Sequence, residues 1–153
     1  MSAASERTSP AAVEAAPRGR NPFDDSAVRR DEDGLARYVD RPDSLVHLLR
    51  ASVDRDSAAA AIVEVGGRSL SYGELWDGAA RVAGGLREAG IGRGDRVAIR
   101  LGNGADWVLA FFGVQLLGAV VVPVNTRFTD EEVAYVVQDS GAALTFAPDA
   151  PLP

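Results

Sequence analysis

The sequence contains no cysteine and no lysine, and its only histidine is His47. Without cysteine the chain can form no disulfide, no thiolate nucleophile and no cysteine-based zinc site. All 16 basic residues are arginines, so no lysine can act in catalysis. His47 has no second imidazole and no nucleophile at a fixed spacing, which is typical of a surface or packed histidine. We therefore predict no metal site and assign no catalytic residue.

Two further features are missing: a basic stripe and an apolar N-terminal run. The 153 residues carry 22 acidic and 16 basic side chains, a net charge of −6, which argues against nucleic-acid binding. The N-terminus has no apolar stretch of the kind found in signal peptides or membrane anchors. The sequence therefore predicts a globular protein of about one domain in the cytoplasm.

Residues 1–42 are rich in proline and charge and poor in large apolar side chains. Such a composition buries too little apolar surface to offset the entropy of ordering the backbone. We predict a mostly disordered leader over residues 1–42. The alternative is a docking tail that lays residues 21–23 and 35–39 across a partner surface.

From residue 43 the pattern becomes regular. Apolar spacing predicts a helix over residues 45–53, capped by Asp43 or Ser44. A hairpin is expected next, with strands at 60–65 and 68–70 around a Gly66-Gly67 turn.

A longer helix is expected from Ser71, whose hydroxyl can form a capping box with the carboxylate of Glu74. Its apolar residues recur every three or four positions up to Leu86, and Gly90 ends it.

A βαβ unit is predicted next: a strand over 96–101, a loop over 102–104, a helix over 105–117 and a strand over 119–124. The two strands should be parallel and the crossover right-handed. Residues 107–124 carry no charge, which raises a transmembrane alternative. The change from helix formers to valines at Gly118 favours a buried helix followed by a buried strand, and no transmembrane segment is predicted.

Gly102-Asn-Gly104 follows a strand and opens a helix, as a dinucleotide-binding loop does. The position of the third glycine is occupied by Trp107, however, and Asn125 stands where an acidic residue would bind the ribose. A dinucleotide-binding βαβ module therefore remains only a remote alternative.

Five motifs in order resemble the N-terminal portion of an AMP-forming acyl-CoA synthetase of the adenylate-forming superfamily, in its fatty-acyl/aryl-CoA ligase branch. They are Leu70-Ser-Tyr-Gly-Glu-Leu75, Gly94-Asp-Arg-Val-Ala-Ile99 with Gly90 before it, Val122-Pro-Val-Asn-Thr-Arg127 after Gly118-Ala119, Glu132 with Tyr135, and Asp139-Ser-Gly-Ala142. The resemblance implies an α/β fold of βαβ units, with a mainly parallel sheet flanked by helices after the disordered leader. It also implies ATP-dependent activation of a carboxylic acid to an acyl-adenylate, followed by thioester formation with CoA.

The motifs of this family that hold the ATP phosphates, the adenylate and the ribose, and its late catalytic lysine, do not occur in the sequence. We therefore expect residues 43–147 to be a partial N-terminal domain and residues 148–153 a truncated tail. The chain should be inactive and should hold no cofactor alone, although the resemblance implies ATP, Mg²⁺ and CoA for the full-length enzyme. Its expected partner is the remainder of the synthetase chain. The alternative is a non-enzymatic interaction module, or half of a split synthetase.

Arg127 is the one candidate binding residue. Pro123 lacks an amide and belongs at a strand end or sheet edge, and Asn125 can bond its own backbone as the chain turns. A second capping box, Thr129 with Glu132, predicts a helix over residues 130–139. Arg127 then either pairs with Asp130 or Glu131, or, as the resemblance implies, contacts a phosphate of the CoA nucleotide.

Overall fold

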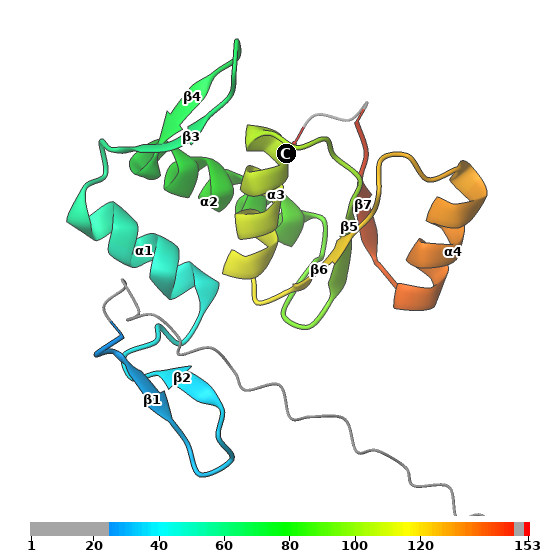
Figure 1. Cartoon of the computed structure of the whole chain (residues 1–153). Coiled ribbons are helices and arrows are strands. Elements are labelled where there is room, and N and C mark those ends of the chain that lie inside the picture. The colour runs from blue at the N-terminus through cyan, green and yellow to red at the C-terminus, as the bar shows by residue number, and fades with distance from the viewer. Residues whose placement is uncertain (1–24, 149–151) are drawn as a thin grey trace, which may run out of the picture. The chain divides into compact units, whose positions relative to one another are not determined.

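A computed structural model describes residues 25–148 and 152–153 of the chain. The chain divides into two compact units, residues 1–41 and residues 42–153, which are described separately (Figure 1).

The first unit contains a hairpin of β1 (Val28–Arg30) and β2 (Ala36–Tyr38), which pair antiparallel. Arg29 and Arg37 lie directly opposite each other, and Arg37 bonds to the carboxylates of Asp31 and Asp33 in the connecting loop. We predicted no strands here, because no apolar alternation marks them; backbone pairing and these ion pairs form the hairpin instead. The predicted disorder over residues 1–24 lies outside the described residues.

The second unit begins with the predicted helix and hairpin. Helix α1 (Leu45–Arg55) starts after Ser44, whose hydroxyl accepts the amide of His47 at 3.1 Å. Strands β3 (Ala60–Val63) and β4 (Ser69–Ser71) pair antiparallel. In the turn between them Gly66 has a positive φ of +72°, a conformation that glycine adopts without strain.

Helix α2 (Tyr72–Glu88) has the predicted capping box, in which Glu74 accepts the backbone amide of Ser71 at 2.8 Å. Gly90, at φ +84°, follows its last turn. The sequence therefore located both ends of this helix.

A parallel sheet of order β6-β5-β7 forms the rest of the unit, which is mixed α/β as predicted. Its elements in chain order are β5 (Arg96–Ile99), α3 (Ala105–Leu116), β6 (Val120–Pro123), α4 (Asp130–Ser140) and β7 (Leu144–Phe146). The predicted βαβ unit and second capping box are confirmed, and β7 is an addition. Pro123 is the last residue of β6, at an edge of the sheet, where it costs no ladder bond.

The connection β5-α3-β6 moves toward one edge of the sheet, and β6-α4-β7 moves back across β5. Two right-handed crossovers in opposite directions place their helices on opposite faces. Figure 1 shows α3 on one side of the sheet, beside α2, and α4 on the other.

The core lies between the sheet and the pair α2 and α3. Val97 and Ile99 of β5, Leu86 of α2 and Val114 of α3 are fully buried. The two helices approach closely at Gly113, where a Cβ would lie 2.5 Å from Cγ1 of Val82. Glycine is required here for close packing, because the opposing valine occupies the space of a side chain.

The uncharged stretch 107–124 forms most of α3 and then β6, as predicted. The expected burial of the strand is wrong, because β6 lies at an edge of the sheet and both of its ends are exposed. Across the part of the chain that the structure describes, no helix is long and apolar enough to cross a membrane.

Helix α4 has no buried residue. Its C-terminal end is held by Arg96 of β5, whose guanidinium donates to the carbonyls of Ser140 at 2.9 Å and Gly141 at 3.3 Å. A cation at this end also interacts favourably with the helix dipole. Side-chain hydrogen bonds therefore attach this end of α4 to the sheet, in addition to the half-buried side chains of Val133, Val136 and Val137.

Candidate functional site

The carboxyl ends of β5 and β6 form the candidate site. The loop after β5 leads to α3 on one face, whereas the loop after β6 leads to α4 on the other. Adjacent loops that part toward opposite faces leave a crevice at the carboxyl ends of the strands, which is where α/β sheets commonly bind ligands.

A pocket of about 520 Å³ occupies this place. It is lined by residues from the two loops and the first turn of α3: Leu101, Gly102, Asn103, Trp107, Pro123, Val124, Asn125, Thr126 and Arg127. The Trp107 ring is stacked on Phe111, with ring centroids 5.4 Å apart and planes 14° from parallel. The pocket thus combines one aromatic ring, two amide side chains and one cation.

Asn125 shapes the loop that carries Arg127. Its side-chain oxygen accepts the amide of Arg127 at 2.9 Å, and its carbonyl accepts the amide of Phe128 at 3.1 Å. The predicted bond from Asn125 to its own backbone is confirmed, and residues 125–128 form a tight turn. Asn125 is thus a structural residue of the pocket wall.

The guanidinium of Arg127 is exposed and makes no hydrogen bond or ion pair with any described residue. Of the two alternatives for Arg127, the pairing with Asp130 or Glu131 is not formed among the described residues, and Asp130 pairs with Arg100 at 3.4 Å instead. Arg100 reaches Asp130 from the neighbouring strand, a contact that local sequence spacing could not reveal. Arg127 is therefore available to an anionic ligand.

The N-terminus of α3 borders the pocket and already has an acceptor. Glu64, from the β3–β4 hairpin, accepts the amide of Ala105 at 2.8 Å, and a Cβ at Gly104 would lie 2.7 Å from the same carboxylate oxygen. A phosphate bound as in a dinucleotide-binding loop needs this amide. The position of Glu64 thus argues against the dinucleotide-binding alternative.

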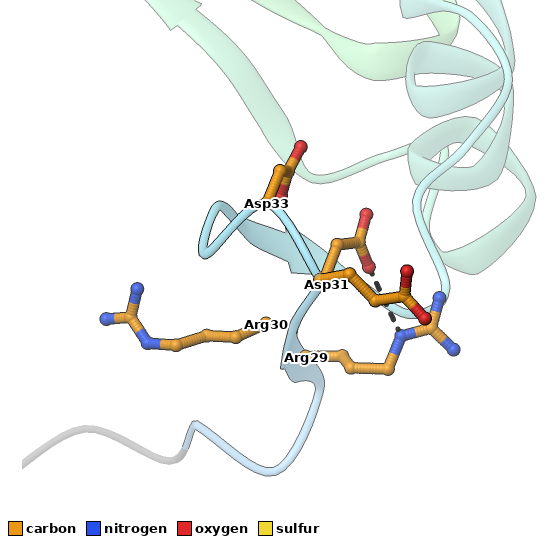
Figure 2. Close-up of a pocket in the computed structure, with 5 residues that line it drawn as sticks. Arg29, Arg30, Asp31 and Asp33 are labelled. Atoms are coloured by element: carbon orange, nitrogen blue, oxygen red, sulfur yellow. Dashed lines mark ion pairs between the residues drawn. The ribbon is translucent and has the colours of Figure 1, made fainter.

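A second hollow lies on the β1–β2 hairpin and is lined by residues 29–33 (Figure 2). Nε of Arg29 lies 3.5 Å from a carboxylate oxygen of Asp31. Figure 2 shows this pair, with Arg30 pointing away from it. These charges are exposed and largely satisfy one another, so we assign no ligand to this hollow.

His47 lies on α1 with an exposed side chain, and its Nδ1 is 4.0 Å from a carboxylate oxygen of Asp43. Within residues 25–148 and 152–153, no three acidic or histidine side chains come together in a way that could hold a metal ion.

The sequence profile of the family described as AMP-binding enzyme matches residues 49–152. The chain belongs to this family. The match includes all the elements from β3 to β7, and with them both loops of the pocket.

Two curated relatives of this AMP-binding chain are a long-chain-fatty-acid–CoA ligase, FadD13 of Mycobacterium tuberculosis, and a fatty acid–[acyl-carrier-protein] ligase, ScoC of Streptomyces coeruleorubidus. The identities are 39% over 85 residues and 41% over 83 residues, and each alignment covers 54% of this chain. The aligned stretch is only 17% of FadD13 and 16% of ScoC.

A solved structure agrees with these relatives. The inhibitor-bound N-terminal domain of FACL13 from M. tuberculosis superposes with a TM-score of 0.64 at 34% identity, over 70% of this chain and 28% of that domain. The chain therefore corresponds to a part of an N-terminal adenylate-forming domain.

From the sequence, Arg127 was predicted as a binding residue and Asn125 only as a turn residue, and Asn103 and Trp107 were not predicted at the pocket. Both follow β5, and Asn125 follows β6, so the signal was the presence of polar or aromatic residues after two parallel strands. Using that signal required knowing that β5 and β6 are neighbours, which their pairing in the structure establishes.

Proposed function

We propose that this chain is the N-terminal part of an AMP-forming acid–CoA ligase. In that reaction a carboxylate oxygen attacks the α-phosphate of ATP, giving an acyl-adenylate and releasing pyrophosphate. The CoA thiol then attacks the acyl carbonyl, AMP leaves, and the thiol proton is lost. The family match, and relatives that are named as acid–CoA ligases, support this proposal.

The observation that carries the proposal for this chain is the unpaired guanidinium of Arg127 at the pocket between β5 and β6. Arginine binds phosphate with charge-assisted and often bidentate hydrogen bonds. We assign to Arg127 a contact with a phosphate of the CoA nucleotide. Trp107 and the two asparagines offer a ring face and amide groups for the rest of that nucleotide.

The residues present do not fit the triphosphate of ATP or its Mg²⁺. The chain has no lysine, and the described residues contain no cluster of metal ligands. Stabilising the transferred phosphoryl group requires convergent cations and amides. We therefore propose that this chain alone forms no acyl-adenylate and depends on the remainder of a synthetase chain.

The surface of the second unit supports such a partner. Large apolar side chains are exposed on α1, on β3 with the turn after it, on β6 and on α4, namely Leu45, Leu48, Val63, Val65, Val120 and Tyr135. Additional chain of the length that the relatives have would cover such surfaces. A cytoplasmic location is part of the proposal, since such enzymes act on soluble ATP and CoA. The interaction module and the split synthetase remain the alternative predictions.

Binding of a CoA fragment tests the role of Arg127. Adenosine 3′,5′-bisphosphate, at millimolar concentration, should shift the NMR signals of the Trp107 indole and of residues 125–127. Arg127→Ala should weaken this binding by about 5- to 150-fold, the range for one charge-assisted hydrogen bond. Arg87→Ala, which removes an exposed arginine on α2, is the matched control and should bind normally. If Arg127→Ala binds the bisphosphate as tightly as the wild-type chain does, Arg127 makes no phosphate contact and is only a residue of the turn.

Catalytic incompleteness is tested by carboxylate-dependent exchange of labelled pyrophosphate into ATP. The purified chain should give no exchange above the blank without acid, with short, medium or long-chain acids. Exchange with any acid would show that the chain contains its own catalytic groups.

A further inference from the structure

Arg100 follows the last residue of β5 and connects that strand to the loop before α4. Its Nη2 donates to the carbonyl of Phe128 at 2.8 Å, and its Nη1 lies 3.4 Å from a carboxylate oxygen of Asp130. The side chain is only 23% exposed, whereas that of Asp130 is 99% exposed. The bond to Phe128 is therefore the stronger of the two, because the pairing with Asp130 is screened by water.

The turn over residues 125–128 is joined to the sheet by this contact and, directly before the turn, by the bond from the amide of Val124 to the carbonyl of Ile99 at 3.0 Å. Its other bonds, from the amides of Arg127 and Phe128 to Asn125, lie within the turn and fix its shape alone. Among the described residues, Arg100 is the only side chain from outside the turn and α4 that bonds to it.

Fold stability alone does not favour an arginine at this position. The Nε of Arg100 is buried and has no hydrogen-bond partner among the described residues. A buried N–H without a partner is unfavourable, and an apolar side chain would avoid that cost. What the arginine provides is the hydrogen bond to the carbonyl of Phe128 in the turn.

We propose that Arg100 is a positioning residue for the phosphate contact of Arg127. It does not line the pocket but holds the Phe128 carbonyl, so that the preceding residue, Arg127, stays at the pocket rim. A planar guanidinium can bond a carbonyl and a carboxylate at the same time, whereas the ammonium of lysine is a point charge on a flexible stem. This inference rests on the proposed function of Arg127.

The chain offers a matched control on the same strand. Arg96 lies on the same face of β5 as Arg100 and bonds to the opposite end of α4, far from the pocket residues in the chain. Arg96→Met and Arg100→Met each remove one arginine that connects β5 to α4. Only Arg100→Met removes the hold on the turn at residues 125–128.

Hydrogen exchange without ligand is the first test. Arg100→Met should speed exchange at the amides of Arg127 and Phe128 by about 5- to 150-fold, the range for one hydrogen bond to a charged group. Arg96→Met should instead affect the amides of Gly141 and Ala142. Unchanged exchange at Arg127 and Phe128 in Arg100→Met overturns the inference, whether or not any nucleotide binds.

Binding of adenosine 3′,5′-bisphosphate is the second test. Arg100→Met should weaken binding by at most the loss in Arg127→Ala, about 5- to 150-fold. Arg100→Lys should show most of the same loss although it keeps the charge, and Arg96→Met should bind normally. In the Arg127→Ala background, Arg100→Met should add little, because it acts through Arg127. The same loss in both backgrounds, or full affinity in Arg100→Lys, would overturn the positioning role. No binding by the wild-type chain would instead refute the proposed function, and hydrogen exchange would still decide the role of Arg100.

Discussion

Helices α3 and α4 follow adjacent strands of one sheet and cover its opposite faces, yet they are attached in different ways. Helix α3 buries Ala105, Ala110, Gly113 and Val114, and it packs against α2 through a glycine contact. Helix α4 buries no residue, begins with three acidic residues and is held near its ends by Arg96 and Arg100. The same crossover geometry is thus stabilised mainly by full apolar burial on one face, and by half-buried valines with side-chain hydrogen bonds on the other.

The two kinds of attachment should respond differently to perturbation. Apolar burial acts along the whole helix and couples it to the core, so that losing part of it lowers the global free energy of unfolding. Hydrogen bonds at helix ends hold only those ends and allow local opening. We therefore expect α4 to open at a lower free energy than α3.

The largest difference should come from removing the same two methyl groups on each helix. Val114→Ala empties fully buried space in α3 and should lower the free energy of unfolding by about 2–3 kcal/mol. Val136→Ala, at a half-buried position in α4, should cost less than about 1 kcal/mol. Urea unfolding followed by circular dichroism measures both. If both variants lose the same free energy of unfolding, α3 and α4 do not differ in how strongly they are coupled to the core.

The next effect concerns the C-terminal end of α4. Arg96→Met removes two hydrogen bonds and a favourable charge at the helix dipole, so the last turn of α4 should open more easily by about 1–2 kcal/mol. Amide exchange there should rise by about 5- to 30-fold while α3 amides keep their rates. A parallel rise in α3 would mean that α4 is coupled to the core.

Capping boxes give a smaller and closely matched comparison. Ser71→Ala in α2 and Thr129→Ala in α4 each remove one side-chain cap, worth about 1 kcal/mol. Because α2 belongs to the core, Ser71→Ala should lower the urea midpoint of the whole chain. Thr129→Ala should mainly speed exchange in the first turn of α4. A lower midpoint of the same size in Thr129→Ala would contradict the comparison.

The smallest effect is the pH dependence of the α2 cap. The backbone amide of Ser71, and then its hydroxyl, bond to the Glu74 carboxylate and lower its pKa below the ordinary value of 4.5. Because the folded pKa lies below the unfolded one, this contribution is fully present above the unfolded pKa and is lost as pH falls through the folded pKa. In Ser71→Ala the pKa of Glu74 should rise only part of the way back, since the backbone amide remains. An NMR titration of the carboxyl group measures it, and an unchanged pKa would show that the hydroxyl contributes nothing.

Local signals in the sequence were enough for most of the second unit. The capping boxes at Ser71 and Thr129 located the starts of α2 and α4, because a cap depends on residues three positions apart. Pro123 indicated a strand end or sheet edge, because its missing amide is a property of that residue alone. These features are fixed by neighbours in the chain and can therefore be predicted from it.

What the sequence did not reveal depends on distant partners. Strand β7 has only three residues and is defined by its pairing with β5, and the β1–β2 hairpin has no apolar alternation. In the candidate site Arg127 was found, but its freedom from Asp130 was not, because Arg100 competes for that carboxylate from another strand. Pairings between strands thus account for most of what was missed.

The contact between Glu64 and the first amide of α3 also bears on folding during synthesis. The two residues are 41 positions apart, with Glu64 made first. At the usual rate of chain elongation, Glu64 leaves the ribosome about 2–8 s before Ala105, the first residue of α3. A hairpin forms within about 10 μs, so the β3–β4 hairpin has ample time to form before the residues of α3 emerge. The carboxylate that caps the first turn of α3 is thus synthesised before that helix, and its own hairpin has time to pair first.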